Sequence, residues 1–195
     1  MKLKDIIVME APYLHDEELG YKVLAHISNS ALTRAYTHFV KIGDIDIYSN
    51  IHGGFIAGYK REDSLSMVVS ISTRYDAYPV VPTQLGKYQQ ISMVNVSSLY
   101  AERGNTKLVY TAIANKLDLV SDNEQYLGAQ GLWKSLARSS DINVYVFDGR
   151  IKDYVRDSSG KIIKYNGKNI DDKEIWGSKD SYRAVLLVGT TKELK

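Results

Sequence analysis

Cysteine is absent from this 195-residue sequence, and phenylalanine and proline each occur only three times. The absence of cysteine excludes disulfide bonds, thiolate metal sites and a cysteine nucleophile. Long apolar runs are also missing, since no stretch approaches the roughly 18 residues that a membrane-spanning helix needs. The start, MKLKDIIVMEAPYLHDEE, has too short an apolar run for a signal peptide. We therefore expect a cytoplasmic protein with no membrane partner.

The chain also lacks a strong charge of either sign, with 25 basic and 23 acidic residues and a formal net charge of +2. Because contacts with phosphates supply most non-specific affinity for nucleic acids, this balance argues against a nucleic-acid partner. The motifs G-x-S-x-G and G-x-x-x-x-G-K-[ST] are missing. No histidine forms an HxH or HxxxH pair, so we predict no metal site; the histidines are His15, His26, His38 and His52.

The length predicts a single domain over residues 1–195. In its N-terminal half, residues 16–36 favour one or two helices. Alternating apolar and polar residues then indicate strands, and GFIAGYKR and SLSMVVSISTR continue them as an antiparallel meander. Residues 74–87 contain two of the three prolines and are predicted to form a loop.

Strands and helices alternate over residues 88–148, which form the predicted core of an α+β layered fold. The expected order is strand, turn, helix, strand, helix and strand, in YQQISMVNVSS, AERGN, TKLVYTAIANK, LDLVSD, GAQGLWKSLAR and DINVYVFD. Residues 149–180 carry the turn signals DSSG and YNGK and are predicted to form inserted hairpins. The apolar run AVLLVG predicts a strand covered on both faces.

The hairpin region is locally basic. Residues 150–168 contain six basic and two acidic residues. Such a run is typical of a solvated face, and the alternative is a docking edge for an acidic partner.

The turn before the first central helix is the best candidate for a chemical role. Arg103, Gly104 and Asn105 stand immediately before a helix start. There, free backbone N–H groups and the positive helix end favour a bound phosphate. We expect Gly104 in the first turn of the helix, with its amide facing a cleft beside the strand that ends at Val96.

Residues 92–148 resemble the GNAT superfamily of N-acetyltransferases through VNVSS, RGNTKL, LDLVSD and QGLWKSLA. They look closest to divergent members common in bacteriophages and mobile elements. The resemblance implies a mixed, mostly antiparallel sheet flanked by helices, acetyl-CoA as cofactor and an amine acceptor. It also implies that the VNVSS strand splays from its neighbour and that RGNTKL binds the cofactor pyrophosphate. The implied cofactor-binding residues are Val94, Val96, Arg103, Gly104, Asn105 and Thr106.

Three positions depart from the family pattern Gln/Arg-x-x-Gly-x-Gly/Ala and its catalytic tyrosine. Ala101 replaces the leading Gln or Arg, and Thr106 replaces the final Gly or Ala. Trp133 stands where many members have the tyrosine that protonates the departing thiolate, so we expect it in the core. Tyr126 and Tyr145 are then the remaining candidate catalytic acids.

Two functions follow from the resemblance and its departures. The first is an acyl-CoA-dependent N-acyltransferase. The alternative is a catalytically degenerate GNAT-fold protein of a phage or mobile element, which binds a host macromolecule in the host cytoplasm in an anti-defence or regulatory role. A third hypothesis, a DNA-associated relative, is weakened by the near-neutral charge.

Overall fold

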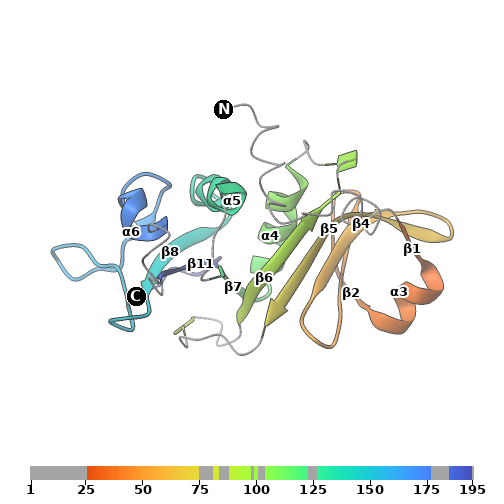
Figure 1. Cartoon of the computed structure of the whole chain (residues 1–195), viewed down its shortest axis with the longest axis horizontal. Coiled ribbons are helices and arrows are strands. Elements are labelled where there is room, and N and C mark those ends of the chain that lie inside the picture. The colour runs from red at the N-terminus through yellow and green to blue at the C-terminus, as the bar shows by residue number, and fades with distance from the viewer. Residues whose placement is uncertain are drawn as a thin grey trace.

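One curved sheet organises the part of the chain that the computed structural model describes, which is residues 26–74, 81–83, 88–97, 99–100, 104–122, 127–176 and 185–194 (Figure 1). The eleven-stranded sheet has the order β10-β8-β11-β7-β6-β5-β4-β3-β2, with β1 beside β5 and β9 beside β8. The strands are β1 His26–Ser28, β2 Thr37–Ile42, β3 Ile45–Ser49, β4 Phe55–Lys60, β5 Ser64–Arg74, β6 Tyr88–Val96, β7 Asp118–Val120, β8 Asn143–Asp148, β9 Asp153–Tyr154, β10 Lys164–Tyr165 and β11 Val185–Thr190. All these pairs are antiparallel except β6 with β7, which is parallel.

Four helices accompany the sheet in the described residues: α3 Asn29–Ala35, α4 Asn105–Ala114, α5 Leu127–Ala137 and α6 Asp172–Trp176. Helices α4 and α5 pack on one face, because their apolar residues share the main core with the strands. Val109 and Ile113 come from α4, and Leu136 comes from α5. The prediction of a mixed, mostly antiparallel sheet is confirmed. The fold is mostly sheet with few helices, so the layered α+β description fits only in part.

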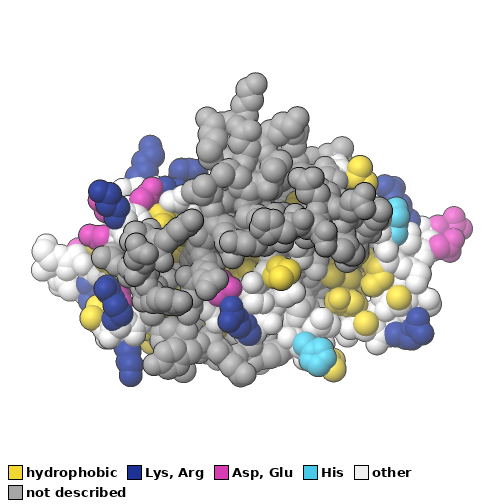
Figure 2. All heavy atoms as spheres, in the orientation of Figure 1, with side chains coloured by type: hydrophobic (Ala, Val, Ile, Leu, Met, Phe, Trp, Pro, Cys, Tyr) yellow, Lys and Arg dark blue, Asp and Glu magenta, His cyan; other side chains and the backbone are white. Residues whose placement is uncertain are grey.

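The N-terminal meander is confirmed as β2 to β5. Hydrophobic side chains gather at the surface over this end of the sheet (Figure 2). Within the described residues 26–36 the helix prediction holds for α3 and is wrong for residues 26–28, which pair with β5 as a strand. Ser28 ends that strand and caps α3, because its hydroxyl accepts a 3.3 Å hydrogen bond from the Ala31 amide. Residues 16–25 lie outside the described residues.

The C-terminal part also follows the prediction in outline. Strand β11 is buried along its whole length between β7 and β8, as the run AVLLVG indicated. The inserted hairpins correspond to short pairings, in which β9 and β10 lie on β8 and Arg156 bridges Ile162. Helix α6 was not predicted from the sequence.

Gly58 of β4 lies opposite a bulge in β5. A Cβ atom added at Gly58 would lie 2.3 Å from the carbonyl oxygen of Ser66. Real Cβ atoms do not come so near a backbone atom, so glycine is required here for the strands to pair.

We predict that Gly58→Ala lowers the free energy of unfolding by roughly 1–3 kcal/mol or more, because the added methyl group overpacks against backbone that cannot move aside. Urea unfolding followed by circular dichroism measures this change. Ser72→Ala, at an exposed position of β5, serves as the control and should stay within about 0.5 kcal/mol of wild type. Equal stability of the two variants would contradict the prediction.

Candidate functional site

Strands β6 and β7 pair along three residues of each strand, and the ladder then ends. Their parallel ladder pairs Tyr88 with Asp118, Gln89 with Leu119 and Gln90 with Val120. Strand β6 continues to Val96 along β5 alone, and within the described residues 91–96 no strand pairs with it on the β7 side.

The hydrogen bonds of Ser121 extend the pairing with β11 by one residue beyond the end of β7. The Ser121 amide donates to the carbonyl of Leu187 (2.9 Å), and the Leu187 amide donates to the Ser121 hydroxyl (2.9 Å). Ser121 therefore stays beside β11 where the ladder between β6 and β7 ends. Residues 91–96 of β6 pair with β5, and the splaying of the VNVSS strand that the resemblance implies stays a prediction.

Side chains join the two strands at the point where the ladder ends. Gln90 donates from Nε2 to the carbonyl oxygen of Ser121 (3.1 Å). Arg74, the last residue of β5, reaches across β6 and donates from one guanidinium nitrogen to both carboxylate oxygens of Asp122 (2.7 and 2.8 Å). We call Arg74, Gln90, Ser121 and Asp122 the vertex residues.

A bulge at Ser92 determines which side chains of β6 face the helices. Met93 pairs with Ser72 and Ile91 with Thr73, which leaves Ser92 as the extra residue. As a result, Ile91 and Val94 both lie in the core beneath α4. Val96 is buried as well, at 8% exposure. Two of the predicted cofactor-binding residues, Val94 and Val96, thus lie on the stretch of β6 that pairs with β5 and has no strand on the β7 side in the described residues.

The predicted helix start at Gly104 is confirmed. Gly104 is the N-cap of α4, with φ 67° and ψ 13°, and it is exposed. This left-handed conformation suits glycine, and an added Cβ would meet nothing within 4 Å. Asn105 and Thr106 follow in the first turn, and the Asn105 side chain donates to the carbonyl of Tyr100 (3.2 Å). Arg103 lies outside the described residues.

Trp133 lies in the core, as expected from its helical neighbours. It is 2% exposed, and its ring meets Tyr110 edge-on at 5.9 Å. Its other neighbour is Gly189 of β11, where an added Cβ would lie 3.2 Å from the indole ring. The α5 position that carries a proton donor in the resembled family therefore serves packing in this chain.

Tyr145 lies away from Gly104 and Val96. It belongs to β8, which β11 and β7 separate from β6. Its neighbours Val144 and Val146 face the helices, so Tyr145 faces the opposite side, and its hydroxyl accepts a hydrogen bond from the Leu194 amide (3.3 Å). Burial raises the pKa of Tyr145, which makes it a weaker proton donor. The second candidate acid, Tyr126, lies outside the described residues.

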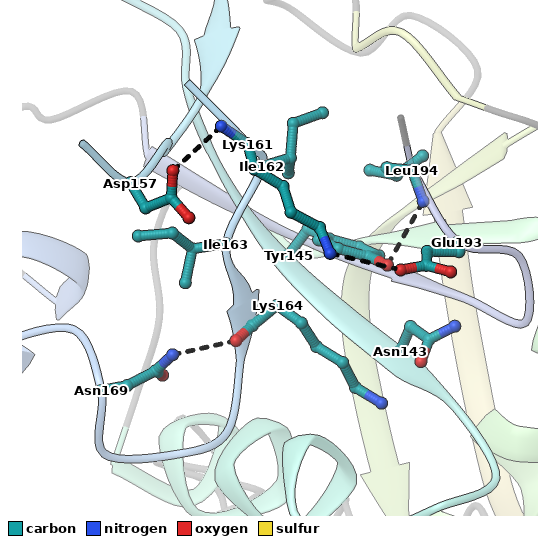
Figure 3. A pocket seen from close by; sticks show the side chains of 10 residues that line it. All are labelled: Asn143, Tyr145, Asp157, Lys161, Ile162, Ile163, Lys164, Asn169, Glu193 and Leu194. Atoms are coloured by element: carbon teal, nitrogen blue, oxygen red, sulfur yellow. Dashed lines mark hydrogen bonds and ion pairs between the residues drawn. The ribbon is translucent and has the colours of Figure 1, made fainter. Parts of the chain in front are cut away.

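Tyr145 lines a pocket of about 690 Å³ between β8, β10 and the C-terminal segment (Figure 3). The polar groups in this pocket bind one another. Lys161 forms an ion pair with Glu193 (3.9 Å). The side-chain amide of Asn169 donates to the carbonyl of Lys164 (2.9 Å), and the side-chain amide of Asn143 donates to the carbonyl of Lys192 (3.2 Å). The pocket does not adjoin the vertex residues or Gly104, none of which lines it.

Sequence reasoning did not identify the vertex residues. The signals present were the polar pair Gln89 and Gln90 at the start of an apolar strand, and a Ser-Asp dipeptide directly after LDLV. The predicted strand SLSMVVSISTR ends at Arg74, as β5 does, although Arg74 is also the first residue of the predicted loop over residues 74–87.

Comparison with protein-family models, with curated proteins and with solved structures found no match. In the described part of the chain, no group of three or more His, Asp or Glu side chains is placed to hold a metal ion. None of the described helices combines the length and apolar character needed to cross a membrane.

We predict that the protein loses stability between about pH 10 and pH 12. Burial raises the pKa of Tyr145 and Tyr154, and it raises that of Tyr165 to about 12. Tyrosines in the unfolded chain ionise near pH 10, so the stability from these neutral phenols is complete below that pH and is lost as the pH rises through the folded-state values. Urea unfolding at pH 9, 10 and 11 measures the fall. Tyr165→Phe should make the free energy of unfolding fall less steeply with pH. A free energy of unfolding that is independent of pH over this range would contradict the prediction.

Proposed function

We propose that this chain has a GNAT-like fold and acts as an acyl-CoA-dependent N-acyltransferase. The observation that supports the proposal is the parallel pair β6 and β7, whose ladder ends at Gln90 and Val120, with α4 connecting the two strands. Ligands of α/β sheets bind where neighbouring strands separate at their carboxyl ends.

The order of the last strands also supports the GNAT-like fold. Strand β6, helix α4, strand β7, helix α5 and strand β8 follow one another along the chain. Strand β11 then inserts between β7 and β8. This succession agrees with the strand, pyrophosphate turn, helix, strand and helix that the resemblance implies, and the sheet has more strands before β6 than that resemblance accounts for.

The start of α4 fits a pyrophosphate. Gly104 is exposed and carries no side chain, so a phosphate can approach its backbone. The first amides of a helix have no acceptor within the helix, so those of Asn105 and Thr106 are suited to donate to phosphate oxygens. Arg103 would add a positive charge there. Val94 and Val96 lie on the stretch of β6 that has no strand on the β7 side in the described residues. Their backbone groups would bind the cofactor arm and orient the acyl carbonyl.

We predict that Gly104→Val lowers the affinity for CoA at least about tenfold. A β-branched residue disfavours a positive φ and covers the amides at the helix start. The matched control is Gly160→Val, since Gly160 is also a glycine of positive φ whose added Cβ would meet nothing within 4 Å. Isothermal titration calorimetry with CoA measures both variants.

Wild-type protein should also melt about 5 °C or more higher at a hundredfold excess of CoA over its Kd, because the ligand binds only the folded state. No shift in wild type at millimolar CoA would overturn the proposed function. An equal loss of affinity in the Gly160→Val control would show that the helix start is not the site.

Binding of a macromolecule without catalysis is the second candidate function. The observation that favours it is the burial of Trp133 and Tyr145, which leaves neither side chain near Gly104 as a proton donor. General acid catalysis contributes typically 10²–10⁴-fold to a rate, so its loss would leave a weak enzyme or a binding protein.

Release of free CoA thiol from acetyl-CoA in the presence of amines separates these two functions. We expect thiol release above the rate without protein, and we expect Gly104→Val to abolish it. CoA binding without thiol release for any amine tested would favour the non-catalytic function.

A further inference from the structure

The locally basic stretch over residues 150–168 keeps cations that no carboxylate of the described structure neutralises. Half of its six basic residues form ion pairs with carboxylates: Arg150, Arg156 and Lys161. The other half have no ion-pair partner in the described part of the chain: Lys152, Lys164 and Lys168. Of these, Lys164 lines the pocket of about 690 Å³ that Tyr145 also lines.

Lys164 and Tyr145 lie side by side at this pocket. They are directly opposite each other in the antiparallel pair of β10 and β8, so their side chains project from the same face of the sheet. Lys161 lines the pocket as well, and its ammonium extends to the Glu193 carboxylate (3.9 Å), whose charge also acts on Tyr145 (Figure 3). Two ammonium groups and a phenol therefore border one cavity.

The Tyr145 hydroxyl adds a hydrogen-bond donor to these cations. Its oxygen accepts from the Leu194 amide (3.3 Å), and none of the described residues accepts its proton. Burial raises the pKa of Tyr145, so the hydroxyl keeps that proton at neutral pH. Because Tyr145 is only 2% exposed, a ligand oxygen that accepted this proton would satisfy a buried donor.

The carboxylates that line the pocket leave the two ammonium groups available. One oxygen of Asp157 accepts hydrogen bonds from the Ser159 hydroxyl and from the amides of Ser159 and Lys161, so this carboxylate is engaged in its own turn. Glu193 holds Lys161 weakly, since the charged atoms are 3.9 Å apart and the two side chains are 71% and 75% exposed. Solvent screens such a pair, so a ligand of higher charge can take the place of Glu193.

A phosphomonoester matches these groups better than a carboxylate does. Its second pKa is about 6, so at about pH 8 it carries close to two negative charges and can pair with both lysines. A carboxylate, with one charge, would only replace Glu193. The pocket has the size of a small-molecule site and is much larger than a phosphate group. Ile162 and Leu194 also line it and offer apolar contacts to the organic part of the ligand.

We propose that this pocket binds a small molecule through a phosphomonoester group, which Lys161, Lys164 and the Tyr145 hydroxyl hold together. The site is separate from Gly104 and from the vertex residues, and it does not rest on the proposed function.

Isothermal titration calorimetry of the full-length protein without CoA, at about pH 8, tests the proposal with phenyl phosphate, phenyl sulfate and benzoate. The first two share a shape and differ by one charge, and benzoate offers a single carboxylate. We expect wild type to bind phenyl phosphate at least about tenfold more tightly than either of the others, the order expected for a charge-assisted hydrogen bond. Lys164→Gln should remove this preference. Lys168→Gln is the matched control and should keep it, because Lys168 is an equally unpaired lysine of the same stretch that does not line the pocket.

Amide chemical shifts in NMR spectra locate the bound phosphate, since the start of α4 is also suited to bind one. We expect the amides of Lys164 and Leu194 to shift with phenyl phosphate in wild type and to remain unshifted in Lys164→Gln. The proposal is overturned if wild type shows no preference for phenyl phosphate, if the two lysine variants lose the preference equally, or if only amides at the start of α4 shift. Phenyl phosphate binding at Lys164 in a protein that does not bind CoA would refute the proposed function and leave this inference standing.

Discussion

The two hydrogen bonds between Ser121 and Leu187 are the constraint on which the rest of the candidate site depends. They hold the chain after β7 against β11, and they do so with a side chain that is 1% exposed. Because buried main-chain groups must find partners, the Ser121 hydroxyl satisfies the Leu187 amide at the end of the regular ladder. In the described structure, residues 91–96 of β6 have no strand beside them on the β7 side. A ligand that supplies hydrogen bonds there would complete the sheet.

The bulge at Ser92 determines which side chains of β6 face the helices and which face the opposite side of the sheet. Without the extra residue, Val94 would face away from α4, since side chains alternate along a strand. With it, Ile91 and Val94 both contribute to the core beneath the helices. The opposite face carries one cross-strand row that runs Arg74, Gln90, Val120, Val188 and Tyr145. Arg74 at one end of this row lies at the vertex, and Tyr145 at the other end lies three strands from Gln90.

The sequence predicted those parts of the site that local patterns determine. The helix start at Gly104 follows from a glycine between an apolar strand and a periodic apolar helix, and both features are local. The hydrogen bonds that hold Ser121 against Leu187 could not be predicted from local patterns, because the two residues are 66 positions apart. Asp122 was missed for a similar reason, since its partner Arg74 lies 48 positions away. Strand β1 was predicted as helix because three residues carry no periodicity of their own, and pairing with β5 decides their conformation.

The burial of Trp133 bears on the chemistry of the proposed acyltransferase. The indole fills the space between Tyr110 and Gly189 and so anchors α5 to the sheet. A thiol ionises near pH 8.5, so a thiolate is a competent leaving group even when no acid protonates it. Acyl transfer without a tyrosine at this position is therefore slower but chemically complete, because binding and orientation at the vertex contribute independently of proton donation. Turnover is therefore the property that separates the proposed acyltransferase from the proposed non-catalytic protein.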